Sequence, residues 1–151
     1  MEPSVILQKI QHYCAFRERC TKEVTEKLQE WKVKPVLIES TLTRLKKDNF
    51  LDDERFAKAF ARGKFRISKW GRNRIAYELK KKNIPEELIA AGLSEIEEEE
   101  YGKVIRNLIL KKKNENKSGK SLNIRNKIIN FVSARGFEMT LILDAIKEMK
   151  L

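Results

Sequence analysis

The chain has 151 residues and a formal net charge of +11, from 33 lysines and arginines against 22 aspartates and glutamates. Hydrophobic residues make up 41% and charged residues 36%, with 6 glycines and 3 prolines, which is typical of a helical protein with a modest core and excludes wholesale disorder. No apolar run approaches the ~20 residues that cross a bilayer, so we expect a soluble, cytoplasmic protein.

The positive charge is unevenly distributed along the chain. Residues 1–50 carry a balance of +3, residues 51–100 balance at zero, and residues 101–151 carry +8. The neutral middle hides a basic segment, residues 62–82, with nine cations and one acid, followed by an acidic stretch. Such a segment can displace counterions from a phosphate backbone. The alternative is a solvated helical face with no ligand.

Apolar residues recur at i, i+4 and i+7, which predicts amphipathic helices, while strand signals are nearly absent. The fold class is therefore all-α. Asp52 is a predicted N-cap, Pro85 is predicted in a first helical turn, and Gly136 is predicted to end a helix in left-handed conformation. Residues 111–121 are polar and predict a loop. In chain order, the predicted helices span residues 4–16, 21–31, 36–48, 53–67, 71–82, 85–97, 97–113, 122–134 and 138–150.

Seven apolar positions recur twice without gaps, after shifts of 51 and then 53 residues. They predict three repeats, 1–50, 51–98 and 99–151, of three helices each. Because units of ~50 residues are small for independent stability, we expect them to stack into an elongated, curved rod. The three sets are Val24, Leu28, Val33, Leu37, Ile38, Leu42 and Leu45; Ile75, Leu79, Ile84, Leu88, Ile89, Leu93 and Ile96; and Ile128, Val132, Phe137, Leu141, Ile142, Ile146 and Met149.

Residues that could support catalysis or bind a metal are scarce. The single histidine, His12, has no carboxylate or cysteine at ligand spacing, and Cys14 and Cys20 are expected on different faces of a helix as buried small hydrophobes. Residues 52–54 (DDE) are explained more simply as a helix cap than as a Mg²⁺ cluster. No phosphate-binding loop or nucleophile elbow is present. We therefore expect no enzyme activity, no cofactor and no metal.

Four stretches carry recognisable motifs: residues 51–57 (LDDERFA), 70–82, 131–137 and 17–24. In their order and spacing they resemble the RecX regulatory proteins, which control the bacterial recombinase RecA. Residues 51–57 match the most recognisable signature of that family. Residues 70–82 (WGRNRIAYELKKK) and 131–137 (FVSARGF) are similar to its motifs in the second and third repeats. Residues 17–24 (RERCTKEV) correspond more loosely, with Cys20 where the family has Ser and Val24 where it has Leu. The cap of that helix is expected to lose a hydroxyl, or to shift to Thr21.

The resemblance implies a three-repeat helical modulator that docks in the groove of the filament formed by RecA on single-stranded DNA. It would reduce strand exchange and coprotease activity, and so damp recombination, DNA repair and the SOS response. The implied partners are RecA and single-stranded DNA, with weaker binding of duplex DNA, and the protein is expected to be a monomer without membrane contact.

Cations and one aromatic residue are the candidate nucleic-acid and partner contacts. Trp70 is expected to be exposed in a turn, while Tyr77 is assigned to core packing rather than base stacking. The acidic residues 95–100 either begin a helix or pair with a basic neighbour. The candidate residues are Arg62, Lys64, Arg66, Lys69, Trp70, Arg72, Arg74, Lys80, Lys81, Lys82, Lys111, Lys112, Lys113, Arg125, Lys127 and Arg135.

The alternative function is a stand-alone basic DNA-binding regulator of the helix-turn-helix type, because three-helix units resemble that fold. Reading a major groove requires exposed Arg, Asn or Gln on a recognition helix. The third helices, near residues 85–97 and 138–150, carry acids instead, which argues against this alternative.

Overall fold

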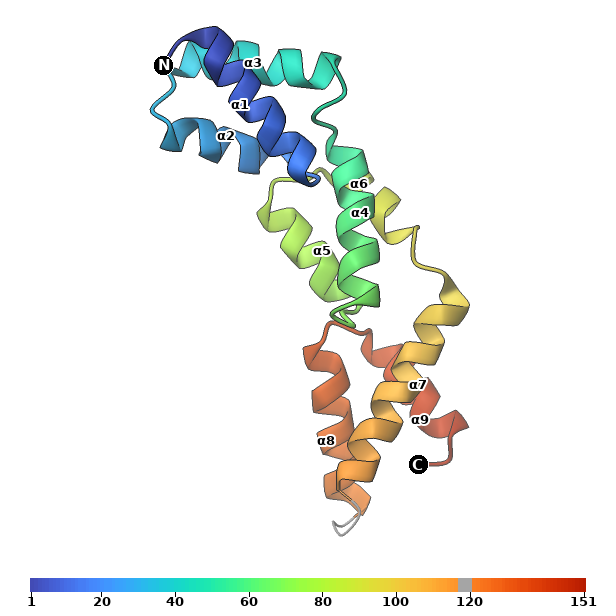
Figure 1. The fold of residues 1–151 in the computed structure, drawn as a ribbon. Helices are drawn as coiled ribbons and strands as arrows, with labels where there is room; N and C mark the ends of the chain where they lie inside the picture. Colours follow the sequence, from blue (N-terminus) through green and yellow to red (C-terminus); the bar gives the residue numbers. More distant parts are fainter. Residues whose placement is uncertain (117–120) are drawn as a thin grey trace. The chain divides into compact units, whose positions relative to one another are not determined.

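In the computed structural model, residues 1–116 and 121–151 are described, and they form nine α-helices and no strand (Figure 1). The prediction of an all-α fold of three tandem three-helix repeats is confirmed. The helices are α1 (Pro3–Phe16), α2 (Thr21–Glu30), α3 (Pro35–Lys47), α4 (Asp53–Arg66), α5 (Arg72–Lys81), α6 (Glu86–Leu93), α7 (Glu98–Glu115), α8 (Ser121–Ala134) and α9 (Met139–Glu148).

The repeat pattern found in the sequence marks the interior of all three sets of helices. Every one of its apolar positions is buried or half-buried. The backbone repeats as well, because the residue in left-handed conformation after the second helix of each set is Lys32, Asn83 or Gly136, at the same spacings of 51 and 53 residues. A left-handed residue at this place ends a helix and turns the chain back. The prediction for Gly136 is confirmed, with φ at +98°.

Two helix ends differ from the sequence prediction. α6 stops at Leu93 and not near residue 97, because the amide of Ile96 donates to the carbonyl of Leu93 in a tight turn that buries Ile96. α7 continues through Glu115, so residues 111–115 are helical and not part of a loop. An ion pair between Lys112 and Glu115 supports this last turn. The predicted loop at 117–120 lies outside the described residues.

Helix caps follow the expected chemistry with small shifts. The Asp52 carboxylate accepts a 3.1 Å hydrogen bond from the amide of Arg55, which confirms it as the N-cap of α4. Pro85 lies one residue before α6 instead of within its first turn, and its carbonyl accepts from Ile89. The cap of α2 stays at Cys20, whose amide donates to the Glu23 carboxylate, and does not move to Thr21.

The chain divides into two compact units, and the division falls within the second repeat. The first unit contains Met1–Ala59 and Leu79–Gly92. Here α1, α2 and α3 contact one another around Ile10, Leu28 and Leu45, which are fully buried. Polar contacts link the start of α2 to the start of α4: the amide and hydroxyl of Thr21 both donate to the Asp53 carboxylate, at 2.8 and 2.9 Å.

The second unit contains Phe60–Glu78 and Leu93–Leu151. In it α7, α8 and α9 contact one another around buried aliphatic residues such as Ile109 and Ile142. Three rings continue this core: Tyr101 lies between Phe65 and Phe137, with centroids 5.7 and 5.1 Å away. Such ring pairs stabilise a core beyond the area that they bury.

Candidate nucleic-acid interface

The structure separates the candidate binding residues by unit and by what they contact. Lys80, Lys81 and Lys82 belong to the first unit, and all the others belong to the second. A cation that already pairs with a carboxylate inside the protein has less to offer a phosphate than one that faces only rings or water. This distinction divides the candidate set.

Two cations lie over the ring of Trp70. The Lys64 ammonium is 4.8 Å and the Arg74 guanidinium carbon 4.2 Å from the ring centroid, while Phe60 meets the ring edge-on at 6.3 Å. Trp70 is half-buried, and its amide donates to the carbonyl of Lys64. These contacts pack Trp70 against α4 while its two cations stay near solvent, a pairing of ring and positive charge that suits a nucleotide.

A second ring carries cations in the same way. The Lys112 ammonium and the Arg135 guanidinium carbon each lie 5.1 Å from the centroid of Phe131. Arg135 also donates a 3.1 Å hydrogen bond to the carbonyl of Ser68, two residues before Trp70. The two clusters are therefore joined, and we call them together the basic-aromatic strip. Its members are Lys64, Trp70, Arg74, Lys112, Phe131 and Arg135.

The sequence prediction included five members of this strip but not Phe131. That residue opens the FVSARGF motif in α8, and it lies four residues before Arg135, which directly follows the helix. This spacing puts two side chains on the same side of a helical turn. The i, i+4 pairing of an aromatic residue with an arginine was the available signal.

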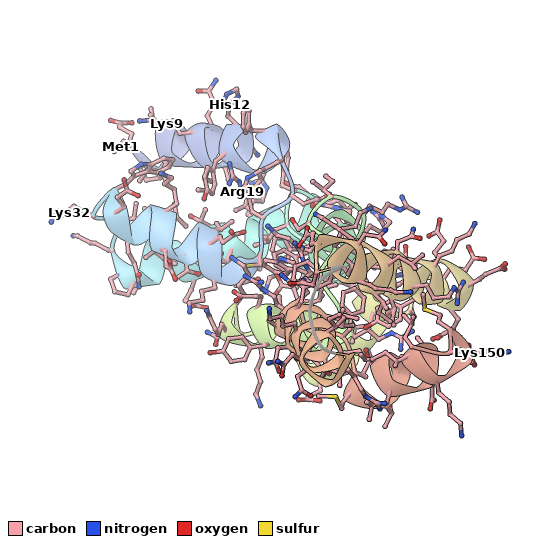
Figure 2. The ribbon with its side chains drawn as sticks, turned by 90° about the horizontal axis from the view of Figure 1, so that it is seen from below. Met1, Lys9, His12, Arg19, Lys32 and Lys150 are labelled. Atoms are coloured by element: carbon pink, nitrogen blue, oxygen red, sulfur yellow. The ribbon has the colours of Figure 1, made fainter. Side chains whose placement is uncertain are left out.

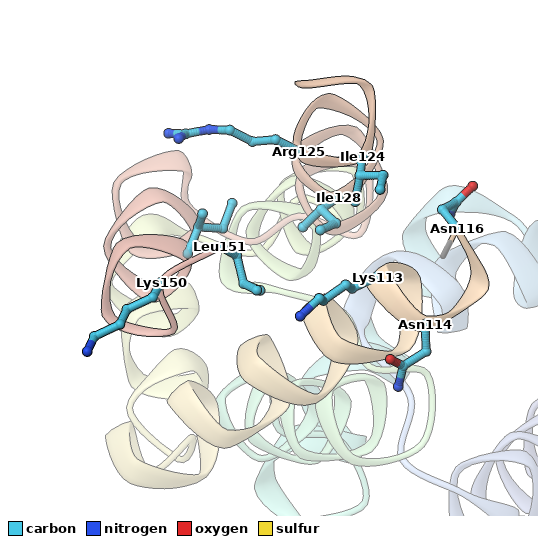
Figure 3. Close-up of a pocket in the computed structure, with 9 residues that line it drawn as sticks. Lys113, Asn114, Asn116, Ile124, Arg125, Ile128, Lys150 and Leu151 are labelled. Atoms are coloured by element: carbon cyan, nitrogen blue, oxygen red, sulfur yellow. The ribbon is translucent and has the colours of Figure 1, made fainter. Parts of the chain in front are cut away.

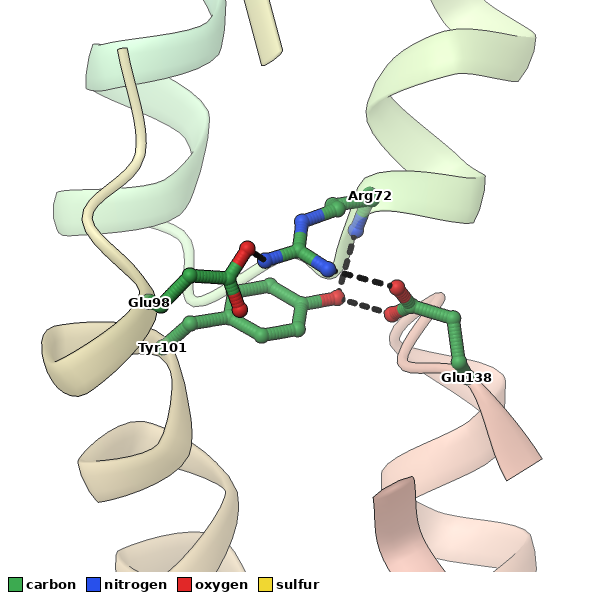
Figure 4. A network of polar contacts seen from close by, with 4 residues as sticks. All are labelled: Arg72, Glu98, Tyr101 and Glu138. Carbon is green, nitrogen blue, oxygen red and sulfur yellow. Dashed lines mark hydrogen bonds and ion pairs between the residues drawn. The ribbon is translucent and has the colours of Figure 1, made fainter. Parts of the chain in front are cut away.

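Arg72 pairs with two carboxylates of its own unit. Its guanidinium pairs with Glu98 at 2.5 Å and with Glu138 at 2.9 Å, and lies 4.0 Å from the ring centroid of Tyr101 (Figure 4). Its amide donates to the Tyr101 hydroxyl, which in turn donates to Glu138. The network joins α5, α7 and the start of α9 within the second unit, so Arg72 serves the fold.

The pKa values of two groups in this network are shifted by burial and by hydrogen bonding to carboxylates. Burial on its own lowers the pKa of Arg72, but the hydrogen bond to Glu98 and the nearby Glu138 carboxylate outweigh it and raise that pKa. Burial, reinforced by the hydrogen bond to Glu138, raises the pKa of Tyr101 well above its ordinary value. Arg72 and Tyr101 therefore both stay in their usual protonation states at neutral pH.

Other candidate cations are also held by carboxylates. Arg62 pairs with Glu95 at 2.7 Å, and Lys82 pairs with Glu23 at 3.3 Å. The acidic stretch thus pairs internally through Glu95 and Glu98, and it also supplies the first turn of α7, where the helix dipole favours negative charge. Both roles expected of residues 95–100 are present.

Lys113 and Arg125 border a separate cavity of about 450 Å³, together with Lys150 (Figure 3). Ile128 and Leu151 form part of its apolar wall. These cations therefore face an apolar pocket between α7, α8 and the end of α9 and are not members of the strip. The remaining candidates are exposed: Arg66, Lys69, Lys80, Lys81, Lys111 and Lys127.

Three further expectations are corrected. Tyr77 is 62% exposed and not part of the core. Trp70 is half-buried where exposure was expected. Cys14 and Cys20 do not share a helix, since Cys20 caps α2, but both thiols are buried as predicted.

Two searches of the described residues bear on other kinds of site. Among them, no group of three or more His, Cys, Asp or Glu side chains is placed to hold a metal ion. None of the described helices has the length and apolar character of a membrane span. The geometry therefore defines a class of protein: a tandem array of three-helix domains with cation-covered rings on its surface.

Comparison with known proteins places this array in a family. Residues 7–45 match the first three-helix domain of RecX and residues 52–93 match the second, together more than half of the chain. The chain belongs to the RecX family of regulatory proteins.

Individual relatives agree. The chain is 33% identical over 132 residues to the regulatory protein RecX of Clostridium acetobutylicum, covering 85% of this chain and 61% of that protein. It is 29% identical over 138 residues to the RecX of Oceanobacillus iheyensis, covering 91% of this chain and 51% of that one. The matches thus span between half and two thirds of those relatives.

The fold is also that of solved RecX structures. The crystal structure of RecX from Lactobacillus salivarius superposes with a TM-score of 0.90 at 22% identity, covering 98% of this chain and 96% of that one. A second RecX crystal structure gives a TM-score of 0.87 at 20% identity, covering 97% and 73%.

Proposed function

We propose that this protein binds the filament of RecA on single-stranded DNA and restrains it, lowering strand exchange and coprotease activity. Membership of the RecX family supports RecA as the partner. The observation that carries the DNA part is the basic-aromatic strip, in which Trp70 and Phe131 each hold two cations. Of these four cations, only Lys112 has an ion pair with a carboxylate among those described, that of Glu115 at the exposed end of α7.

The strip suits single-stranded DNA for two physical reasons. Its cations release counterions when they meet phosphates, which gives affinity that falls with salt. The guanidinium planes of Arg74 and Arg135, held beside these rings, can stack against unstacked bases, which duplex DNA does not expose. A protein that contacts several neighbouring subunits and the strand they hold would oppose the opening and closing that ATP turnover requires.

The test is charge reversal within the strip. Lys64→Glu and Arg74→Glu together should weaken binding to the RecA filament about tenfold or more and flatten its salt dependence, because two phosphate contacts become repulsive. The matched control is Lys103→Glu with Lys147→Glu, two exposed cations of the same unit outside the strip. Filament binding is measured by co-sedimentation, and RecA activity by ATP turnover and strand exchange.

Co-sedimentation repeated without RecA, and again without single-stranded DNA, separates the possible partners. The proposal is supported if binding requires both RecA and single-stranded DNA, and if only the Lys64/Arg74 double variant loses it. Equal inhibition and equal salt dependence of both double variants would contradict it. Tight, sequence-selective binding to duplex DNA without RecA would favour the helix-turn-helix alternative.

A further inference from the structure

A groove in the first unit gathers an unusual set of side chains that the proposed function does not use. Its volume is about 520 Å³, and it lies along α1 and the link that follows it. Three aromatic rings line it, those of Tyr13, Phe16 and Trp31, together with His12, the only histidine of the chain. Its cations are Lys9 and Arg19, and no carboxylate lines it.

The rings and cations of this groove are paired. The Lys9 ammonium is 5.1 Å from the centroid of Trp31, and the Arg19 guanidinium carbon is 3.8 Å from that of Tyr13. Arg19 is buried, 9% exposed, and its Nε donates a 3.2 Å hydrogen bond to the carbonyl of Tyr13. Its charge is therefore fixed in place beside the ring.

Phe16 gives the groove an open apolar face. It is the last residue of α1, and 78% of it is exposed, although a phenylalanine normally avoids water. Figure 2 shows Lys9 and His12 projecting from the same helix, with Arg19 following it. A planar apolar group in the groove would cover the exposed surface of Phe16 and bring an attached anion toward the cations that line it.

We propose that this groove binds an unstacked base of single-stranded DNA with its neighbouring phosphate. The rings supply stacking surface, which tolerates any base because every base has a π face. Lys9 and Arg19 supply positive charge for the phosphate, and none of the described residues that line the groove is a carboxylate. Gln8 and His12 add polar groups that can reach a base edge.

This site is separate from the basic-aromatic strip. Its residues belong to the first unit and to the first three-helix domain, and none is a member of the strip. The proposal concerns DNA alone and holds whether or not the filament proposal does. The groove would be a second binding site for a DNA strand, at residues to which the sequence assigned no binding role.

The two tryptophans allow each site to be observed alone, because Trp31 lies in the groove and Trp70 in the strip. In the Trp70→Phe variant, Trp31 is the only tryptophan, and its fluorescence should be quenched on titration with a short thymidine oligonucleotide. In this background, Phe16→Ala and Lys9→Ala should each weaken binding roughly fivefold or more.

Matched controls exist in the same unit. Val36→Ala, at a residue 83% exposed, and Lys34→Ala, at an exposed lysine, remove similar groups outside the groove and should leave the titration unchanged. Because Phe16 is so exposed, its truncation should leave the fold intact, which far-ultraviolet circular dichroism verifies.

Three results would overturn the proposal. One is absence of Trp31 quenching by the oligonucleotide. Another is equal binding of an abasic strand, which shows that charge acts without stacking. The third is quenching by an acidic, aromatic peptide when the oligonucleotide has no effect, which would make the groove a protein-docking site.

Discussion

Gly71 and Gly136 lie backbone against backbone in the second unit. The amide of Gly71 donates a 2.7 Å hydrogen bond to the carbonyl of Arg135, and the amide of Asn73 donates at 2.9 Å to the carbonyl of Gly136. A Cβ added to Gly71 would overlap the backbone of Gly136, and one added to Gly136 would overlap Arg74. The start of α5 therefore docks on the link between α8 and α9 through main-chain atoms.

Alanine at either glycine should destabilise the protein by about 2 kcal/mol or more. At Gly136 a left-handed backbone adds to the steric overlap, and at Gly71 the overlap acts alone. The control is Gly63→Ala in α4, where no atom lies within 4 Å of an added Cβ. That change should stabilise by up to about 1 kcal/mol, since glycine is a poor helix former. Urea unfolding monitored by circular dichroism measures all three, and equal effects would contradict the close approach.

Arg72 and Arg74 should separate stability from binding. Arg72→Ala leaves Glu98 and Glu138 without their shared cation and should cost about 2 kcal/mol of unfolding free energy. Arg74→Ala, at an exposed residue, should change stability by less than about 0.5 kcal/mol while reducing the salt slope of DNA binding by about 1. Unfolding curves and salt titrations of the same two variants check this, and a loss of stability only at Arg74 would reverse the assignment.

Removal of the Tyr101 hydroxyl should lower the free energy of unfolding, because it leaves the network of Arg72 and Glu138 incomplete. In Tyr101→Phe the amide of Arg72 loses its acceptor and Glu138 loses a donor, which should destabilise by roughly 1–3 kcal/mol. Combined with Glu138→Gln, the loss should be smaller than the sum of the two single losses, because both changes break one network. A double-mutant cycle in urea measures this coupling, and strict additivity would show that the two groups act independently.

Glycine should improve the link after α2. Lys32 has a φ of 62°, a conformation that costs most residues about 1–2 kcal/mol. Glycine adopts this conformation without strain, but it loses more conformational entropy on folding, so only part of the strain energy is gained as stability. Lys32→Gly should therefore stabilise by up to about 1 kcal/mol. Lys46→Gly is the comparison, because Lys46 lies within α3, where glycine is a poor helix former, and should lose up to about 1 kcal/mol. Thermal unfolding at one protein concentration distinguishes the two.

Stability should fall at alkaline pH because the two cysteine thiols ionise more readily in the unfolded chain than in the folded one. Burial raises the pKa of Cys14 and Cys20 from 9.0 to about 11. Between these values the unfolded thiols lose protons that the folded ones keep, so unfolding becomes more favourable as pH rises; below pH 9 this contribution is constant. The variant with Cys14→Ala and Cys20→Ser should lose less stability between pH 9 and 11. Urea midpoints across this range test the difference, and parallel curves would contradict it.

The repeat and its core could be predicted because burial leaves a periodic record in the sequence. Leu28, Leu79 and Val132 occupy equivalent places and all are buried. The pairing of the candidate cations could be predicted only in part. Charge identifies Arg72 and Arg74 equally, but carboxylates 26 and 66 residues further along the chain decide that the first is held internally. Such distant partners have no local signal.

The error at Tyr77 has a local origin. Ile75 and Leu79 form the buried face of α5, and Tyr77 lies midway between them in the sequence. Two residues turn a helix by about 200°, so the side chain of Tyr77 points away from that buried face.

The residue in left-handed conformation after the second helix differs among the three repeats, and packing explains the difference. Lysine and asparagine suffice at positions 32 and 83, and only position 136, where Arg74 approaches, holds a glycine. A glycine at this position therefore indicates that the start of a neighbouring helix packs closely against the link. Across relatives, glycines at the positions equivalent to 71 and 136 should occur together or be absent together. Their covariation would identify the domains that are joined by this backbone contact.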